Sequence, residues 1–328
     1  MKILVTGASG FIGGRFARFA LEQGFEVRVN GRRAQAVEHL LRRGAQYLEG
    51  DLADPDLARR LCAGVEVVVH CAGATGHWGS QAQVYKTQVE TTENVVEACL
   101  KEHVRRLVYV SCADLYFTGR SRREVKEAQL PKRLYDAQAR AGRLAEQRVM
   151  GAEEFGLEVL TLRPAQVIGA GDVAFMPRLL SKKRLAIVGN GLNKVDFTSV
   201  QNLNEALLSA ILANETALGR IYNLSNGTPV PLWDAVNYVL RQLHRPQVVD
   251  RHRSFGLAYA SGALHEAACR IWPGRPQPST SRREARRMKT DFTLDIGQAR
   301  QYLDYRANVD LWAALDEFSA WWRVQGHA

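Results

Sequence analysis

The sequence predicts an α/β protein in which a doubly wound parallel sheet precedes a smaller, mostly helical C-terminal lobe. Three observations support this fold class. Strand and helix patterns alternate in the first half, a glycine-rich turn follows the first strand, and the pattern changes after residue 164. The chain has 328 residues, of which 46% are hydrophobic and 24% charged. That composition excludes intrinsic disorder and is typical of a globular protein.

Short apolar runs alternate with helical patterns as far as residue 162. We expect strands at residues 3–6, 26–29, 65–70, 106–111 and 158–162, helices at 15–23, 35–43, 85–103 and 136–155, and shorter elements at 47–49 and 55–62. This alternation favours right-handed crossovers and a parallel sheet covered on both faces. Glycines and prolines then mark loops, and we expect helices at 204–213, 232–243 and 311–322 and a strand at 220–224.

The sequence carries no signal for secretion or membrane insertion. No apolar run approaches the ~20 residues that a membrane-spanning helix needs, and the N-terminus leads directly into a strand. The five cysteines form no C-x-x-C pair, and the histidines show no metal-ligand spacing. We therefore expect free thiols, a cytoplasmic location and no bound metal.

Positive charge gathers near the C-terminus. The net charge is +10, and residues 241–289 contain 11 Lys or Arg against 3 Asp or Glu. Such a basic field attracts nucleic acid, an anionic membrane surface or an acidic small molecule, although a plain solvated surface also explains it. No nucleic-acid-binding module accompanies it. We therefore expect a small-molecule substrate, with peripheral membrane contact as a further option, and no nucleic-acid partner.

A glycine motif, G-x-x-G-x-x-G at residues 7–13, lies directly between the first strand and the first helix. Glycines allow the tight turn and let the backbone approach a pyrophosphate, while the helix N-terminus offers N–H groups to the anion. At this position the motif predicts the dinucleotide site of a Rossmann fold. We assign residues 1–168 to a dinucleotide-binding domain, to which 195–226 return, and residues 169–194 and 227–328 to a substrate-binding lobe.

The end of the second strand favours NADP over NAD. An NAD site needs a carboxylate there to bind the ribose 2′-hydroxyl, whereas arginine binds a 2′-phosphate. Residues 27–33 contain no Asp or Glu and end in Arg32 and Arg33. The alternative is that both arginines are surface charges that cap a helix.

Several further motifs make the chain similar to a known superfamily. It resembles the extended short-chain dehydrogenase/reductases, the NAD-dependent epimerase/dehydratase group, and within them most closely the 3β-hydroxysteroid dehydrogenase-like branch. The matching segments are G-D-L at 50–52, H-C-A-G at 70–73, Q-V-E-T-T at 88–92, L-R-P-A-Q-V-I-G at 162–169, V-D-F-T-S-V at 195–200 and T-D-F-T-L-D at 290–295. This resemblance covers nearly the whole chain and implies a cofactor-dependent enzyme.

The resemblance also implies which residues contact the cofactor. They come from the glycine turn, the adenine loop, the fourth-strand motif and the segment beside the nicotinamide: Gly7, Gly10, Phe11, Ile12, Gly13, Arg32, Arg33, Asp51, Leu52, Cys71, Ala72, Gly73, Gln88, Ser111, Pro164, Ala165 and Val167. It further implies a homodimer joined through the helices expected at 85–103 and 136–155.

The proton relay of the family has no obvious counterpart in this chain. Members pair a Tyr with a Lys four residues later, because the Lys lowers the Tyr pKa and lets the Tyr transfer a proton. Here Tyr135 is followed by Ala139 at that spacing. The register counted back from residues 163–164 instead aligns Gln138 and Gly142 with the pair.

Three interpretations of the relay stay open. In the first, an insertion shifts the helix, Tyr135 still reaches the nicotinamide, and Arg140 or Arg143 supplies the positive charge. In the second, another group transfers the proton: Tyr116, Asp114, Cys112 or a bound water. In the third, the protein binds NADP(H) without efficient turnover.

Our candidate catalytic residues are Tyr135, Ser111 and Cys112, the last two because they follow the strand at which the assisting Ser of the family lies. We predict an NADP(H)-dependent oxidoreductase that interconverts an alcohol and a ketone on a hydrophobic, anionic substrate of steroid, acyl or polyketide type. The alternatives are a sugar-nucleotide epimerase or dehydratase and a catalytically degenerate NADP(H)-binding sensor. The loop H-W-G at 77–79 either lines the substrate pocket or plugs the rim of the core.

Overall fold

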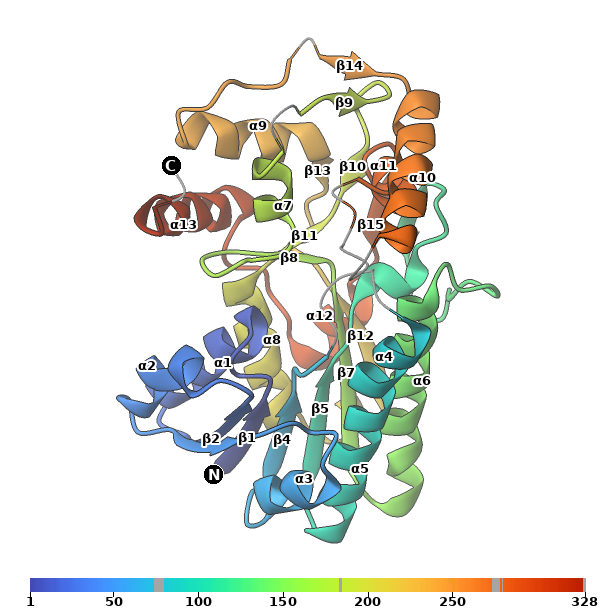
Figure 1. Cartoon of the computed structure of the whole chain (residues 1–328). Helices are drawn as coiled ribbons and strands as arrows, with labels where there is room; N and C mark the ends of the chain where they lie inside the picture. The colour runs from blue at the N-terminus through green and yellow to red at the C-terminus, as the bar shows by residue number, and fades with distance from the viewer. Residues whose placement is uncertain (74–79, 183–184, 250, 273–277, 279, 327–328) are drawn as a thin grey trace.

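The main sheet contains seven parallel strands in the order β12-β7-β5-β4-β1-β2-β3 (Figure 1). The computed structural model describes residues 1–73, 80–182, 185–249, 251–272, 278 and 280–326. The strands are β1 (Lys2–Thr6), β2 (Glu26–Gly31), β3 (Gln46–Glu49), β4 (Val67–His70), β5 (Arg106–Val110), β7 (Glu158–Pro164) and β12 (Arg220–Leu224). The order reverses between β1 and β4, where such sheets bind ligands beyond the carboxyl ends of their strands. The predicted doubly wound sheet is confirmed.

Helices cover both faces of this sheet (Figure 1). One face carries α1 (Phe11–Glu22) and α8 (Val200–Leu212), and α2 (Glu38–Leu41) lies beside α1. The other face carries α3 (Pro55–Cys62), α5 (Thr91–Lys101) and α6 (Ala137–Gly151), with α4 (Gln81–Tyr85) beside α6. Coverage on both sides explains why β4 consists of four consecutive buried residues instead of an alternating pattern.

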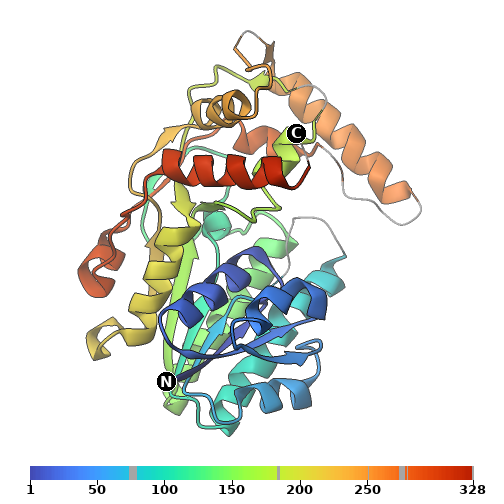
Figure 2. The same ribbon diagram turned by 90° about the vertical axis from the view of Figure 1, so that its left-hand side faces the viewer.

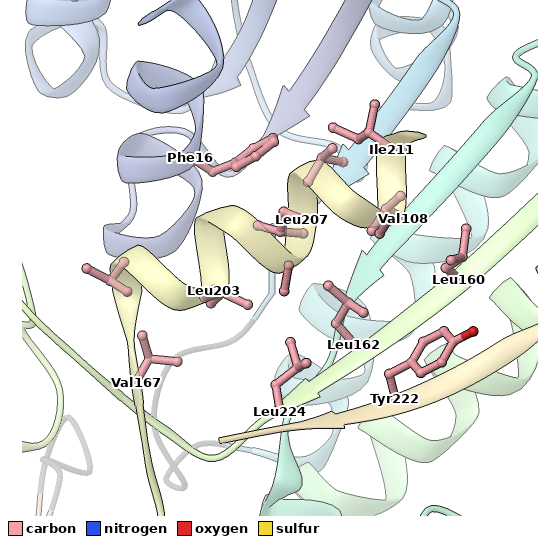
Figure 3. Close-up of a cluster of buried hydrophobic side chains, with 14 of the residues drawn as sticks. Phe16, Val108, Leu160, Leu162, Val167, Leu203, Leu207, Ile211, Tyr222 and Leu224 are labelled. Atoms are coloured by element: carbon pink, nitrogen blue, oxygen red, sulfur yellow. The ribbon is translucent and has the colours of Figure 1, made fainter. Parts of the chain in front are cut away.

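The core of this layer forms where α8 packs on the sheet and on α1 (Figure 3). Leu203 and Leu207 of α8 cluster with Phe16 of α1 and with Leu162 and Leu224 of neighbouring strands, and all five side chains are fully buried. Burial of such a side chain stabilises the fold by about 1.5–3 kcal/mol. This packing holds β7 and β12 together and thereby fixes the segments that follow them.

The second layer contains a small sheet and most of the remaining helices (Figures 1 and 2). Its sheet has the order β13-β10-β15-β6, with β13 (Val230–Pro231), β10 (Lys194–Val195), β15 (Phe292–Leu294) and β6 (Arg122–Val125). Two strand pairs are β8 (Gln166–Ile168) with β11 (Phe197–Ser199), and β9 (Ile187–Val188) with β14 (His252–Arg253). The helices are α7 (Met176–Leu180), α9 (Leu232–Gln242), α10 (Phe255–Ile271), α11 (Arg282–Arg287) and α13 (Leu311–Val324). Helix α12 (Gly297–Leu303) instead packs on β12 and α8 of the main layer.

Two expected helices differ from the structure. The helix expected at 85–103 begins at residue 81, contains a π-helical turn at 86–90 and ends at Lys101. Threonine hydroxyls bind backbone carbonyls along this turn, a bonding mode that distorts helices. The helix expected at 35–43 is a short 3-10 helix at 34–37 followed by the single turn α2. Within the described residues, no helix is both long and apolar enough to span a bilayer.

Candidate active site

The turn between β1 and α1 is packed as a pyrophosphate cradle requires. Gly7 has φ +67°, and a Cβ there would lie 2.8 Å from the backbone of Ala72. At Gly13 a Cβ would lie 2.5 Å from the carbonyl oxygen of Gly7. Gly10 caps α1 in an extended conformation without any side-chain hydrogen bond. The first turn of α1 therefore keeps its N–H groups for an anion, and the residues present fit a dinucleotide phosphate.

The end of β2 offers cationic groups and no carboxylate. A side chain at Gly31 would collide with Ser9 of the glycine turn, since a Cβ there would lie 2.9 Å from that residue. Asn30 is buried and donates hydrogen bonds to the carbonyl oxygens of Leu48 and Gly50, so it ties β2 to the following strand segment. Arg32 and Arg33 are exposed, and no carboxylate of the described residues pairs with either of them.

The other predicted cofactor residues lie at the same carboxyl edge of the sheet. Asp51 follows β3, and its Oδ1 accepts a hydrogen bond from the backbone N–H of Ala53. Cys71, Ala72 and Gly73 follow β4, Ser111 follows β5, and Pro164 ends β7. Buried side chains complete the set: Leu52, Ala165 and Val167. The loop at 77–79 lies outside the described residues.

The π-helical turn at 86–90 aims Gln88 at this edge. Its Nε2 donates to the Tyr109 hydroxyl at 2.9 Å, and its Oε1 would lie 3.1 Å from a Cβ at Gly73. His70, at the end of β4, lies fully buried between the hydroxyls of Thr6 and Thr92 at 2.7 and 3.1 Å. Burial lowers the pKa of His70 to about 4, so the ring is neutral and structural.

Ser111 belongs to a buried ionic network. Its hydroxyl donates to Glu146 Oε1 at 2.6 Å. Arg163 binds the same carboxylate with two hydrogen bonds of 2.7 and 2.6 Å, and both charged side chains are fully buried. The Arg163 guanidinium also donates to the hydroxyl of Tyr116, which in turn donates to Asn223 Oδ1 at 2.8 Å. Tyr116 is fully buried, and its hydroxyl is engaged by protein groups on both sides.

Cys112 lacks the lowered pKa that a reactive cysteine needs. Much of its surface is exposed, yet its inner side is crowded by protein, and this loss of solvation raises its pKa to about 12. The carboxylates of Asp114 and Glu146 contribute to the same rise. A thiol with so high a pKa is neither a nucleophile nor a ready acid at neutral pH.

Tyr135 lies outside the helix on which the family carries its Tyr. Helix α6 begins at Ala137, and Asp136 caps it by accepting a hydrogen bond from the N–H of Ala139. The Tyr135 ring packs against Phe117 at 4.7 Å, with the Arg283 guanidinium 5.4 Å from its centre. Burial raises the pKa of Tyr135, and the positive charges of α11 oppose that rise.

The source of that positive charge differs from our expectation. Arg140 is exposed, and Arg143 contacts the carboxylate of Glu146. The cations that act most strongly on Tyr135 are Arg286 and Arg283, and Arg282 adds a weaker effect.

Gln138 and Gly142 lie one turn apart on α6 and occupy the positions that the family register assigns to Tyr and Lys. The amide of Gln138 donates to Gln88 Oε1 at 3.5 Å. At Gly142 a Cβ would meet Leu115 at 3.0 Å, so even a methyl group is crowded there. Helix α6 contains no lysine. Because α6 also contains no tyrosine, this helix carries no Tyr/Lys pair in any register.

Comparison with known proteins places this architecture in a family. The family described as NAD dependent epimerase/dehydratase matches residues 3–225. The chain belongs to this family. A 2-alkyl-3-oxoalkanoate reductase of Stenotrophomonas maltophilia is 33% identical over 98% of this chain and 99% of its own length. The decarboxylating sterol-4-alpha-carboxylate 3-dehydrogenase of Schizosaccharomyces pombe is 28% identical over 98% of this chain and 97% of its own.

Solved structures of the epimerase/dehydratase family share the fold. An epimerase of Methanothermobacter thermautotrophicus superposes with a TM-score of 0.81 at 18% identity and covers 99% of this chain and 93% of its own. The UDP-glucuronic acid 4-epimerase of Bacillus cereus, solved with NAD, gives a TM-score of 0.78 at 19% identity, with coverage of 98% and 96%. The expected family, its 3β-hydroxysteroid dehydrogenase-like relatives and the enzyme class are thus confirmed.

Our sequence analysis missed the arginines of α11, which contact residues in and after the strands β5 and β8. Arg287 donates to Asp114 at 3.2 Å and to Gln166 at 3.3 Å. Arg283 is nearly buried and pairs with both Asp114 and Asp136. The R-R-E-A-R-R run just before the T-D-F-T-L-D segment was the available signal, but the sequence does not show that its arginines point inward.

Within the described part of the chain, no group of three His, Cys, Asp or Glu side chains could hold a metal ion.

Proposed function

We propose that this enzyme uses NADPH to reduce a ketone of a hydrophobic acid to the alcohol, with a 3-oxo acid as the model substrate. The 2-alkyl-3-oxoalkanoate reductase relative, aligned over both chains almost end to end, supports this substrate class. When bound, the nicotinamide supplies the hydride. The residues of this chain hold the cofactor, orient the acid and deliver a proton to the carbonyl oxygen.

The charge balance around α11 carries the proposal. Arg283 and Arg287 face two carboxylates, Asp114 and Asp136. Arg286 adds a third cation beside them, and none of the described carboxylates pairs with it. Its guanidinium instead stacks on Tyr259, 5.1 Å from the ring centre. One positive charge is left to bind a substrate carboxylate.

The acid-binding role is tested by comparing free acids with their methyl esters. Arg286→Met should raise KM for the acid by roughly tenfold to a hundredfold, the worth of a charge-assisted hydrogen bond, and leave the ester unaffected. Arg282→Met is the matched control, because Arg282 lies on the same helix and is already paired with Glu266. Equal effects on acid and ester would remove the carboxylate from the proposal.

We propose Tyr135 as the proton donor, since Arg286 and Arg283 lie close enough to ease the loss of its proton. Tyr135→Phe should lower kcat at least about a hundredfold. An unchanged rate would refute this role. If the wild type reduces no ketone while still binding NADPH, the sensor alternative replaces the reductase.

The preference for NADPH rests on Arg32 and Arg33, which are exposed next to the glycine turn. Replacing both by Ala should raise KM for NADPH and leave KM for NADH nearly unchanged. A preference for NADPH that survives both substitutions would contradict the assignment.

We also propose a homodimer through α4, α5 and α6. Tyr85 of α4 and Leu144 of α6 are each 40% exposed, and the two helices lie against each other. Leu144→Asp should convert a dimer to a monomer in sedimentation, whereas a monomeric wild type would refute the proposal. All five cysteines are free thiols, which supports a reducing, cytoplasmic compartment.

A further inference from the structure

Helix α10 exposes an apolar face that no other described element covers. Figures 1 and 2 show this helix at the outer margin of the second layer, away from the main sheet. Its large apolar residues are strongly exposed: Leu257 65%, Leu264 74% and Ile271 86%, followed by Trp272 at 66%. Leucines and isoleucines exposed to this degree along one helix mark an interaction site more often than a plain surface.

These residues form one stripe. Leu257, Leu264 and Ile271 are seven residues apart, which is close to two helical turns, so they align along the helix. The buried residues of α10, Ala258, Gly262, Glu266 and Cys269, lie on the opposite side. That side packs against the start of α11, where a Cβ at Gly262 would lie 2.7 Å from the backbone of Ser281. The stripe therefore faces away from the protein.

The charges around the stripe are positive. Arg251 and Arg253 precede the helix, Arg270 lies near its end, and all three are exposed. Glu266 is the single acidic residue between residues 251 and 272, and it is nearly buried in an ion pair with Arg282. A partner of this face must therefore offer both an apolar interior and a negatively charged surface.

We propose that α10 is a docking helix for an anionic lipid surface, lying in the plane of the interface with the stripe inserted among the acyl chains. An exposed leucine stripe with flanking arginines and a terminal Trp suits this position. A second copy of the chain fits less well. Arg253 at one end and Arg270 at the other would bring cations together whether two α10 helices paired parallel or antiparallel.

Docking through α10 would bring α11, in the second layer, close to the membrane. Tyr259 of α10 lies under the Arg286 guanidinium, and α11 begins where α10 packs on Ser281. A hydrophobic substrate dissolved in the bilayer would meet the enzyme at the layer that carries the arginines of α11. The docking proposal itself does not depend on the identity of that substrate.

The test is vesicle flotation of the full chain with phosphatidylcholine vesicles, with and without phosphatidylglycerol. The wild type should float with the anionic vesicles and lose this binding at high salt. Leu264→Glu should weaken binding about tenfold or more, because it removes one inserted leucine and adds a negative charge. Phe155→Glu is the matched control: Phe155 is also 74% exposed but ends the 3-10 helix that follows α6, and its variant should bind like the wild type.

Three results would overturn the proposal. In the first, the wild type does not float with anionic vesicles. In the second, Leu264→Glu and Phe155→Glu float equally well. In the third, sedimentation shows an oligomer that Leu264→Glu dissociates, which would assign the stripe to a second copy. As an independent readout, Trp272→Phe should remove most of the vesicle-induced blue shift of the fluorescence.

Discussion

Replacing Glu146 by Gln should destabilise the protein by about 3–5 kcal/mol, because the substitution leaves a buried guanidinium without its counter-charge. Glu146 and Arg163 are both 0% exposed, and two hydrogen bonds of 2.7 and 2.6 Å join them. The same carboxylate accepts the Ser111 hydroxyl, so the change also removes the partner that fixes this candidate residue at the end of β5.

Urea denaturation followed by circular dichroism at pH 7 measures this effect. The control is Glu38→Gln, which breaks an ion pair with Arg42 whose side chains are 58% and 75% exposed. That change should cost less than about 1 kcal/mol. If Glu146→Gln costs no more than the control, the buried pair does not stabilise the junction of α6 and β7, and our account of Ser111 fails with it.

Three further outcomes test the site. Gly13→Val should abolish binding of NADPH in calorimetry while the fold is retained, because its Cβ would lie 2.5 Å from the Gly7 carbonyl oxygen; binding of normal strength would disprove the cradle. Cys112 has a pKa of about 12, so its alkylation by iodoacetamide should be slow at pH 7 and accelerate up to pH 11, and fast labelling at pH 7 would contradict this. The depressed pKa of His70, about 4, should cost about 3 kcal/mol of stability as pH falls from 6.5 to 4, since the unfolded chain takes up a proton that the folded chain does not; His70→Asn should flatten this slope in urea titrations.

The parts of the site that local sequence determines could be predicted. The glycine turn needs only residues 7–13 between a strand and a helix, and the structure shows each glycine in a contact that leaves little or no room for a side chain. The strands could be predicted equally well, because a parallel sheet covered on both faces requires continuous apolar runs such as that of β4. These features depend on neighbours within a few residues.

The substrate side could not be predicted, because it depends on contacts between distant segments. Arg287 meets Asp114 across 173 residues, and no periodic pattern in a six-residue helix indicates which arginines point inward. Tyr116 illustrates the same limit: its sequence position suggests an active-site residue, whereas Arg163 and Asn223 enclose it. The lobe boundaries at residues 168, 195 and 226 stay a prediction.

The contact between Gly142 and Leu115 constrains which side chains position 142 can hold. A Cβ at position 142 would lie 3.0 Å from the Leu115 side chain, so a lysine there would require Leu115 to shift by a few tenths of an ångström. Leu115 is 1% exposed and has little space into which to retreat. A smaller side chain at position 115 would therefore make a lysine at position 142 easier to accommodate. The two positions are coupled through this contact, so an attempt to build a Tyr/Lys pair into α6 should start at residue 115.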